Sequence, residues 1–155
     1  MSVDTSSQTY ILFQIARSDY GVRSDMVHQV EMIEQVTPLP GAAPYVDGVV
    51  FTRGQVIPAI NLRMRFGFEK TPYDFRSRLV VVNAGGRKVG LVADSAREFI
   101  QIPPDSIRPP NEVITDVHNK YLEGIATLGE RIVLIVNVGE VAAFKEVNEP
   151  AKAGV

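Results

Sequence analysis

Short apolar runs separated by turn residues dominate the hydrophobic pattern of this chain. The runs are rich in β-branched residues and have the length of strands, which favours β structure over helix. The clearest of them span residues 10–16, 54–62, 78–84, 88–93 and 131–138. A membrane-spanning helix needs about 20 consecutive apolar residues. The pattern therefore predicts a mainly β protein that does not insert directly into a membrane.

Turn residues between the runs indicate where strands connect or bend. The segment NAGGRK (residues 83–88) separates two runs and predicts a hairpin turn, because glycine accepts the positive φ that such turns require. Neither a helical pattern nor a Lys-Ser/Thr pair follows these glycines, so they do not predict a phosphate-binding loop. Pro58 lies inside an apolar run and predicts a bend or a strand edge.

Helical patterns are few. Residues 23–34 have apolar positions spaced as one face of two helical turns. These positions are Met26, Val27, Val30 and Ile33. Ser24 or Asp25 is placed to cap the start of such a helix. Short helical turns are also expected near residues 62–66 and 138–144, so the predicted fold is mainly β with a few short helices.

An internal repeat is the most informative feature of the sequence. Residues 45–62 align without a gap on residues 121–138, and residues 10–30 align without a gap on residues 79–99. The matched pairs include Tyr45 with Tyr121, Gly48 with Gly124, Asn61 with Asn137, Gly21 with Gly90 and Asp25 with Asp94. A short insertion at residues 103–116 accounts for the different offsets of the two blocks. Two collinear blocks in the same order indicate a duplication.

Each copy has the size of a small closed barrel, an architecture that protects short antiparallel strands from leaving open edges. The first barrel repeat is expected at about residues 10–66 and the second at about 79–142. Together they predict one domain over residues 10–144. Residues 1–9 and 145–155 are expected to be flexible tails. The groove between two such barrels is a natural place for a partner to bind.

Composition excludes several classes of protein. With 155 residues, of which 45% are hydrophobic, the chain can bury an ordinary globular core. Its net charge of −2 argues against nucleic-acid binding, which normally requires a basic surface. The chain has no cysteine, so disulfides, thiolate metal sites and cysteine nucleophiles are excluded. The polar N-terminus lacks the apolar core of a signal peptide, and a cytoplasmic protein is expected.

The residues that enzymes use do not form a catalytic pattern. His28 and His118 are far apart and have no metal-ligand spacing. No serine lies in a G-x-S-x-G motif. Asp94 follows an apolar strand, as some catalytic aspartates do, but its repeat mate Asp25 has the position of a helix cap. We therefore expect no catalytic residue, no cofactor and no metal.

Arg53 and Gly54 form a charged pair directly before an apolar run. The second copy has Gly129 where the first has Arg53, so the barrel itself does not require an arginine there. Two interpretations remain for Arg53. It is a solvated turn residue, or it presents a charge in the groove between the barrels to an acidic or polar group. Arginine suits the second role because its planar guanidinium makes two hydrogen bonds at once.

Three segments together resemble the CheW-type coupling proteins of bacterial chemotaxis. They are YVDGVVFTRGQVIPAINLRMRFG (residues 45–67), VGLVADSAREFIQIPPDSI (89–107) and YLEGIATLGERIVLIVNVGEV (121–141). The resemblance extends over residues 10–144. Phe51 and Thr52 stand where the family often has Asn-Leu, and Asn61 stands where Asp is common, which bears on the choice of partner.

The resemblance implies two intertwined five-stranded SH3-like barrels without catalytic activity. Such proteins bridge the cytoplasmic tip of chemoreceptors to the regulatory domain of the histidine kinase CheA. They are cytoplasmic and are recruited to receptor arrays at the inner face of the membrane. The alternative is a CheW-like scaffold of a non-flagellar chemosensory pathway, which serves pilus motility or gene regulation.

The resemblance also implies binding residues. The expected receptor-binding residues are Ile11, Val27, Val30, Gly48 and Arg53, of which the first three match apolar positions of the family's receptor groove. Plain core packing is the alternative explanation for those three. The segment 108–113, with Arg108 and Val113 at its ends, resembles a surface that faces the kinase.

Overall fold

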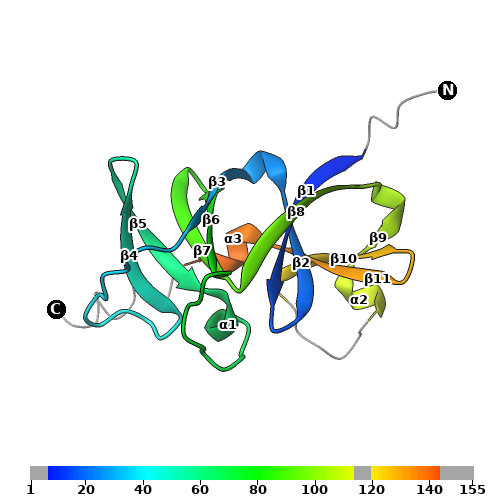
Figure 1. Cartoon of the computed structure of the whole chain (residues 1–155). Coiled ribbons are helices and arrows are strands. Elements are labelled where there is room, and N and C mark those ends of the chain that lie inside the picture. Colours follow the sequence, from blue (N-terminus) through cyan, green and yellow to red (C-terminus); the bar gives the residue numbers. More distant parts are fainter. Residues whose placement is uncertain (1–6, 114–119, 144–155) are drawn as a thin grey trace.

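The computed structural model describes residues 7–113 and 120–143, which form two curved β-sheets lying side by side (Figure 1). Sheet A has the strand order β8 (Ser95–Ile102), β1 (Gln8–Ile15), β2 (Ser18–Arg23), β11 (Arg131–Val136), β10 (Leu122–Leu128) and β9 (Ile107–Arg108). Sheet B has the order β3 (Val27–Met32), β6 (Arg78–Ala84), β7 (Arg87–Ala93), β5 (Gln55–Asn61) and β4 (Val46–Thr52). The helical elements are η1 (Ser24–Met26), α1 (Leu62–Arg65), η2 (Pro104–Ser106), α2 (Pro110–Val113) and α3 (Val138–Val141).

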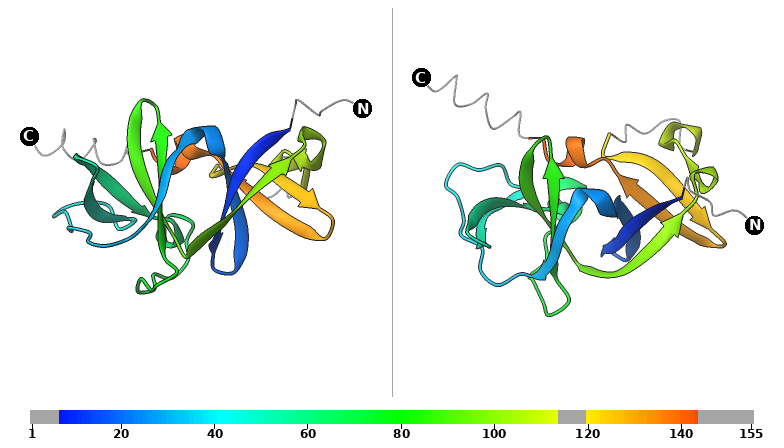
Figure 2. Two further views of the ribbon diagram at one scale, coloured as in Figure 1. Left: turned by 45° about the horizontal axis from the view of Figure 1, so that its top comes forward. Right: turned by 90° about the horizontal axis from the view of Figure 1, so that it is seen from above.

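Each sheet combines strands from both copies of the repeat. The hairpin β1–β2 of the first copy lies between β8 and β11 of the second copy, and the hairpin β6–β7 of the second copy lies between β3 and β5 of the first. The exchanged hairpins are joined to their hosts by the parallel pairs β2–β11 and β7–β5. Two further views show the blue β1–β2 hairpin in one sheet with β8 and β11, which are far from it in sequence (Figure 2). The expected pair of intertwined barrels is confirmed, with the two-residue strand β9 as an addition to sheet A.

The repeat is visible in matching local geometry. The pairing of β4 with β5 has a bulge before Gly48, and that of β10 with β11 has one before Gly124. Asn61 accepts a hydrogen bond from the Met64 N–H and caps α1, whereas Asn137 accepts one from the Glu140 N–H and caps α3. The same cap signal therefore starts a one-turn helix after the last strand of each copy.

The central hydrophobic core lies between the two sheets and is built by both of them. Phe13 and Ile15 of β1 pack there with Val80 and Val82 of β6, and all four side chains are at most 1% exposed. Burying one such side chain stabilises a fold by roughly 1.5–3 kcal/mol. Smaller clusters fill the interior of sheet A and of sheet B. The shared core makes the two barrels one packed unit.

The predicted helix over residues 23–34 is wrong. Only η1 is helical there, and strand β3 follows it. A bulge between Val27 and Gln29 shifts the register against β6, so that Val27 pairs with Val82 and Val30 pairs with Val80. Residues three apart thereby reach the same face of a strand, which imitates the spacing of a helix. Neither Ser24 nor Asp25 caps η1 through its side chain.

The other local predictions agree with the structure. The hairpin turn at residues 83–88 is confirmed, with Gly85 and Gly86 at φ of 58° and 85°. Strand β7 pairs with β5 only from Ala59 onward, so Pro58 lies where one edge of β5 is unpaired, as expected. The short helices expected after β5 and β11 are α1 and α3.

The ends of the domain are described only in part. Strand β1 begins at Gln8, so two residues expected in the N-terminal tail belong to the sheet. The remaining residues of the two predicted tails fall almost entirely in 1–6 and 144–155, outside the described residues, as does His118. Within residues 7–113 and 120–143, no helix is long and apolar enough to cross a membrane.

Candidate partner-binding surface between the sheets

Two exposed apolar side chains lie on the faces of the sheets that turn toward the shared core. Val30 of β3 pairs with Val80, and Phe99 of β8 pairs with Ile11. Directly paired residues lie on the same face of a sheet, and both Val80 and Ile11 belong to the central core. Val30 is 36% exposed and Phe99 is 68% exposed, so they extend that core to the molecular surface on both sides. We call Val27, Val30 and Phe99 the inter-sheet surface.

The three apolar residues predicted to bind a receptor, Ile11, Val27 and Val30, differ in solvent exposure. Val27 is half-buried and packs against the central core. Ile11 is only 5% exposed and is part of that core, so its side chain supports the surface from beneath. Ile11 is thus a core residue, whereas Val30 is exposed enough to contact a partner.

Phe99 was not among the predicted residues, although the sequence contained a signal for it. The repeat aligns Phe99 with Val30, a position that the resemblance had marked. Strands β3 and β8 are the corresponding edge strands of sheets B and A. The equivalence of the two residues predicts that both face the seam between the barrels, and the structure places them so.

Gly48 has a structural reason to be glycine. Its φ is +146°, and a Cβ atom added there would lie 2.1 Å from the Thr37 carbonyl oxygen. Thr37 exchanges two backbone hydrogen bonds of 2.8 Å with Val49, so its segment crosses β4 directly above Gly48. A side chain at position 48 would force this crossing apart.

Arg53 lies in the two-residue turn between β4 and β5, exposed and with a left-handed φ of 52°. The neighbouring Thr52 donates a hydrogen bond of 3.1 Å to Glu31 of β3. This bond ties the turn to the strand that carries Val30. Arg53 is therefore held near one end of the strand that borders the inter-sheet surface.

Arg108 and Val113 lie on a different part of the molecule. Arg108 is exposed on β9, and Val113 is 49% exposed at the end of α2. Both elements border β10 of sheet A, at the opposite end of the molecule from the β4–β5 turn (Figure 1). The residues expected to face the kinase are thus separated from those expected to contact a receptor.

Asp94, the aspartate that follows an apolar strand, has a structural role. Asp94 receives hydrogen bonds from the Arg63 guanidinium and from the Ala16 N–H, which connects three elements. His28 is exposed on β3. Residues 7–113 and 120–143 contain no group of three His, Asp or Glu side chains placed to hold a metal ion. An exposed apolar surface at a seam between two barrels is typical of a protein-docking domain.

Comparison with known proteins gives the family. Residues 9–146 match the CheW-like domain, and the chain belongs to this family. It is 29% identical to the chemotaxis protein CheW of Klebsiella aerogenes over 143 residues, which cover 92% of this chain and 86% of that protein. It is 31% identical to protein FrzA of Myxococcus xanthus over 103 residues, 66% of this chain and 64% of that protein.

A solved structure shows the same fold. The crystal structure of the scaffolding protein TtCheW from Thermoanaerobacter tengcongensis has a TM-score of 0.83 with this chain at 29% identity. The match covers 90% of this chain and 94% of that one. The chain is a chemotaxis adaptor of the CheW type.

Proposed function

We propose that this protein is a non-enzymatic adaptor that couples the cytoplasmic tip of chemoreceptors to the regulatory domain of CheA. The observation that carries the proposal is the inter-sheet surface, where Val30 and Phe99 are exposed although both stand on core-facing sides of their strands. Membership of the CheW-like family supports the choice of partners.

The inter-sheet surface suits an amphipathic helix. Val27 supplies a half-buried apolar base, and Val30 and Phe99 supply an apolar contact on each side of the seam. A receptor helix would lay its apolar face between them, as helices do in hydrophobic grooves. Arg53, beside β3, would then bond to an acidic or polar group of the receptor at the rim. Gly48 would act indirectly, by keeping β4 in place.

The kinase would bind a second surface, formed by the segment from Arg108 to Val113. Because this segment lies at the far end of sheet A, both partners would fit on one molecule at once (Figure 1). Simultaneous binding is what an adaptor requires. The protein would act in the cytoplasm and be recruited to receptor arrays at the inner face of the membrane.

A CheW-like scaffold for pilus motility or gene regulation is the alternative. The similarity to FrzA, a relative that is not named as a chemotaxis protein, favours keeping this second candidate. The fold and the two surfaces would serve either pathway. Identification of the kinase and receptors that co-purify with the chain separates the two.

Binding of the two partners should be separable by single substitutions. Val30→Asp places a charge in the apolar receptor contact and should abolish capture of a receptor cytoplasmic fragment while leaving capture of CheA unchanged. Val113→Asp should do the reverse. Both residues are exposed, so both variants should fold as the unmodified protein does. Loss of both partners by one well-folded variant, or loss of neither by both variants, would contradict two separate surfaces.

A further inference from the structure

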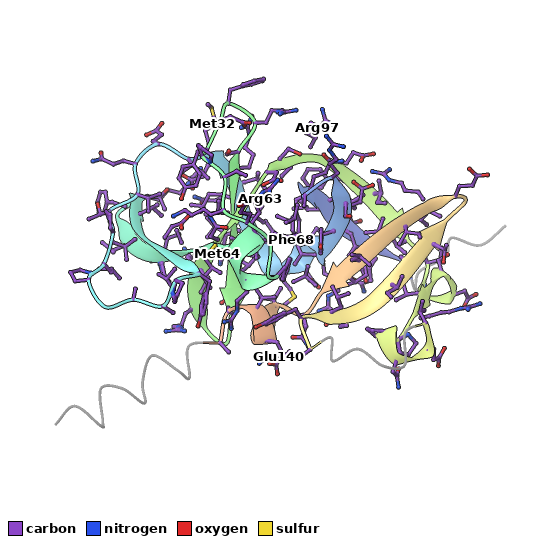
Figure 3. All side chains as sticks on the ribbon, turned by 90° about the horizontal axis from the view of Figure 1, so that it is seen from below. Met32, Arg63, Met64, Phe68, Arg97 and Glu140 are labelled. Carbon is purple, nitrogen blue, oxygen red and sulfur yellow. The ribbon has the colours of Figure 1, made fainter. Side chains whose placement is uncertain are left out.

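A polar cavity of about 330 Å³ lies on the side of the molecule where α1 approaches the β1–β2 turn. Its walls come from the β1–β2 turn, from α1, from the start of β8 and from the segment before β6. Figure 3 views this side and places Arg63 near the middle, where the two sheets meet. Three arginines line the cavity, namely Arg17, Arg63 and Arg76.

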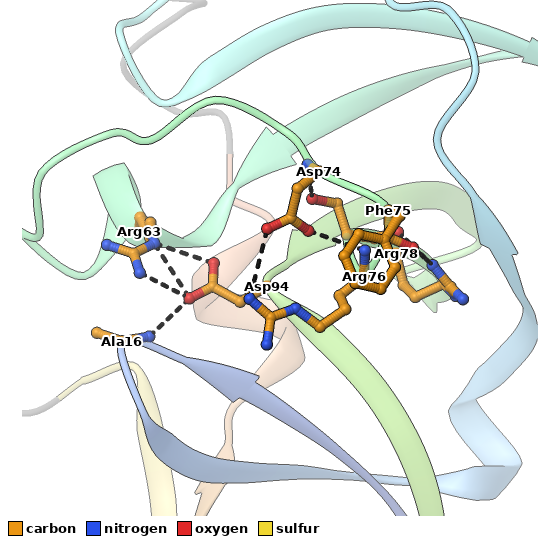
Figure 4. A network of polar contacts seen from close by, with 8 residues as sticks. Ala16, Arg63, Asp74, Phe75, Arg76, Arg78 and Asp94 are labelled. Carbon is orange, nitrogen blue, oxygen red and sulfur yellow. Dashed lines mark hydrogen bonds and ion pairs between the residues drawn. The ribbon is translucent and has the colours of Figure 1, made fainter.

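The two carboxylates of the cavity are already engaged (Figure 4). Asp94 accepts hydrogen bonds of 2.9 Å from Arg63 Nε and 2.8 Å from Arg63 Nη2. Asp74 accepts a hydrogen bond of 2.8 Å from the backbone N–H of Arg76. The ion pair between Asp74 and the Arg76 guanidinium is long, at 3.6 Å, and both side chains are at least half exposed. Arg76 is therefore only loosely held.

Arg17 is the remaining charge. Within the described ranges, its side chain has no hydrogen-bond or ion-pair partner. Counting Asp94 and Asp74 against Arg63 and Arg76, the cavity has one positive charge in excess. This excess is local, because the whole chain has a net charge of −2.

The β1–β2 turn at Arg17 has a backbone strain that glycine would avoid. Ala16 and Arg17 form the β1–β2 turn at φ of 51° and 74°, a region that costs free energy for residues other than glycine. The matching turn of the second repeat has Gly85 and Gly86 at φ of 58° and 85°. An arginine therefore occupies a position where the turn favours glycine. It lies at the edge of a cavity that has one more arginine than it has aspartates. Such local strain is typical of functional positions.

We propose that this cavity binds a small free oxyanion, a phosphate or a dicarboxylate, between Arg17 and Arg76. The planar guanidinium matches both groups through paired hydrogen bonds. The guanidinium of Arg76 also lies over the Phe75 ring, 5.6 Å from the centroid, and both contacts are weak enough for Arg76 to turn toward the ligand. The volume is in the range of ligand sites, roughly 300–1,000 Å³, and the polar walls exclude an apolar ligand. A bound anion would connect the β1–β2 turn of sheet A to the segment that enters β6 of sheet B.

Titration of the full chain with inorganic phosphate and with succinate, at matched ionic strength, tests the proposal. Binding is followed by calorimetry and by the shift of Tm. At least one probe should bind saturably and raise Tm. Arg17→Gly, which installs the residue of the matching turn, should weaken that binding by about tenfold or more. Without anion, the same variant should melt no lower than the unmodified protein, because the turn is relieved of strain.

Two further variants sharpen the result. Arg76→Gln should also weaken binding. Arg87→Ser removes a charge from the hairpin of the other repeat, installs the residue found at the matching Ser18, and should bind as the unmodified protein does. A response to phosphate but not succinate, or the reverse, identifies the anion. A response that never saturates, or equal binding by Arg17→Gly, would overturn the proposal.

Discussion

Arg65 joins the two repeats through the ends of their short helices. Its guanidinium donates hydrogen bonds of 3.1 Å to the carbonyl oxygens of Val141 and Ala143, at the C-terminal end of α3. It also lies over the ring of Tyr45, 3.9 Å from the centroid. A cation at the C-terminal end of a helix satisfies carbonyl groups that have no partner within the helix. In the second repeat, Val141 occupies the position of Arg65. The second repeat therefore has no arginine to make the equivalent contact with the end of α1.

Arg65→Ala should destabilise the protein by about 2–3 kcal/mol, because half-buried carbonyl groups lose a charged donor. Arg65→Lys keeps the charge but not the planar geometry, so its stability should lie between that of Arg65→Ala and that of the unmodified protein. Urea denaturation of the three proteins gives the free energies of unfolding. An Arg65→Ala variant as stable as the unmodified protein would show that water replaces the contact without cost.

Gly48 and its repeat mate Gly124 give a matched pair of substitutions. A Cβ atom at Gly48 would clash with the Thr37 backbone, at a position that also has a positive φ. A Cβ atom at Gly124 would be too close only to the Ile107 side chain, at 2.5 Å. Gly48→Ala should therefore cost about 2 kcal/mol or more. Gly124→Ala should cost clearly less, because a side chain can move. Thermal and urea unfolding measure both, and equal costs would contradict the account of the crossing at Thr37.

At the scale of elements, each sheet is closed by polar contacts between its edge strand and a hairpin. In sheet B, Glu31 of β3 accepts a hydrogen bond from the hydroxyl group of Thr52 at the end of β4. In sheet A, Glu98 of β8 accepts a hydrogen bond of 3.2 Å from Nη1 of Arg131 at the start of β11. Arg131 also donates a bond of 2.9 Å to Asp19 of β2. The closures are equivalent in place but use different residues.

The contact with Arg131 predicts a pH dependence of stability. The hydrogen bond from Arg131 lowers the pKa of the Glu98 carboxyl from its ordinary value. A lowered folded-state pKa stabilises the protein above the unfolded-state pKa, and the contribution is lost as the pH falls through the folded-state value. Arg131→Gln should therefore flatten the loss of stability below about pH 4.5. Urea midpoints of both proteins across acidic pH measure this, and parallel curves would contradict it.

Local strand signals predicted five of the strands correctly but failed at β3. Apolar runs and turn residues predicted β1, β5, β6, β7 and β11, because each of these strands has a continuous apolar run. In β3 the bulge after Val27 gives a strand the spacing of a helix. A bulge depends on pairing with β6, which is distant in sequence, so local periodicity does not reveal it.

At the scale of the whole molecule, the repeat predicted two barrels, and the shared core explains why they form one unit. Strands β1 and β6 come from different copies, and each contributes its apolar face to the same core. The site was predicted less completely. Residue type alone does not separate Ile11, which is core, from Val30, which is exposed. For Phe99 the repeat gives its equivalence with Val30, whereas the face on which it lies depends on its pairing with Ile11 of β1.

In the proposed function, the inter-sheet surface is the receptor site. Phe99 gives the most direct test, because at 68% it is more exposed than Val30, at 36%. Ile132 is a matched control, since it is 56% exposed on β11 and is not part of this surface.

The decisive measurement is the affinity of a receptor cytoplasmic fragment for the unmodified protein, Phe99→Asp and Ile132→Asp. Loss of a central apolar contact and burial of a charge together cost about 2 kcal/mol or more, which is roughly a thirtyfold loss of affinity. Phe99→Asp should show that loss while keeping its fold and its affinity for CheA, and Ile132→Asp should bind the receptor as the unmodified protein does. Unchanged receptor affinity in a well-folded Phe99→Asp variant would contradict the assignment of the inter-sheet surface.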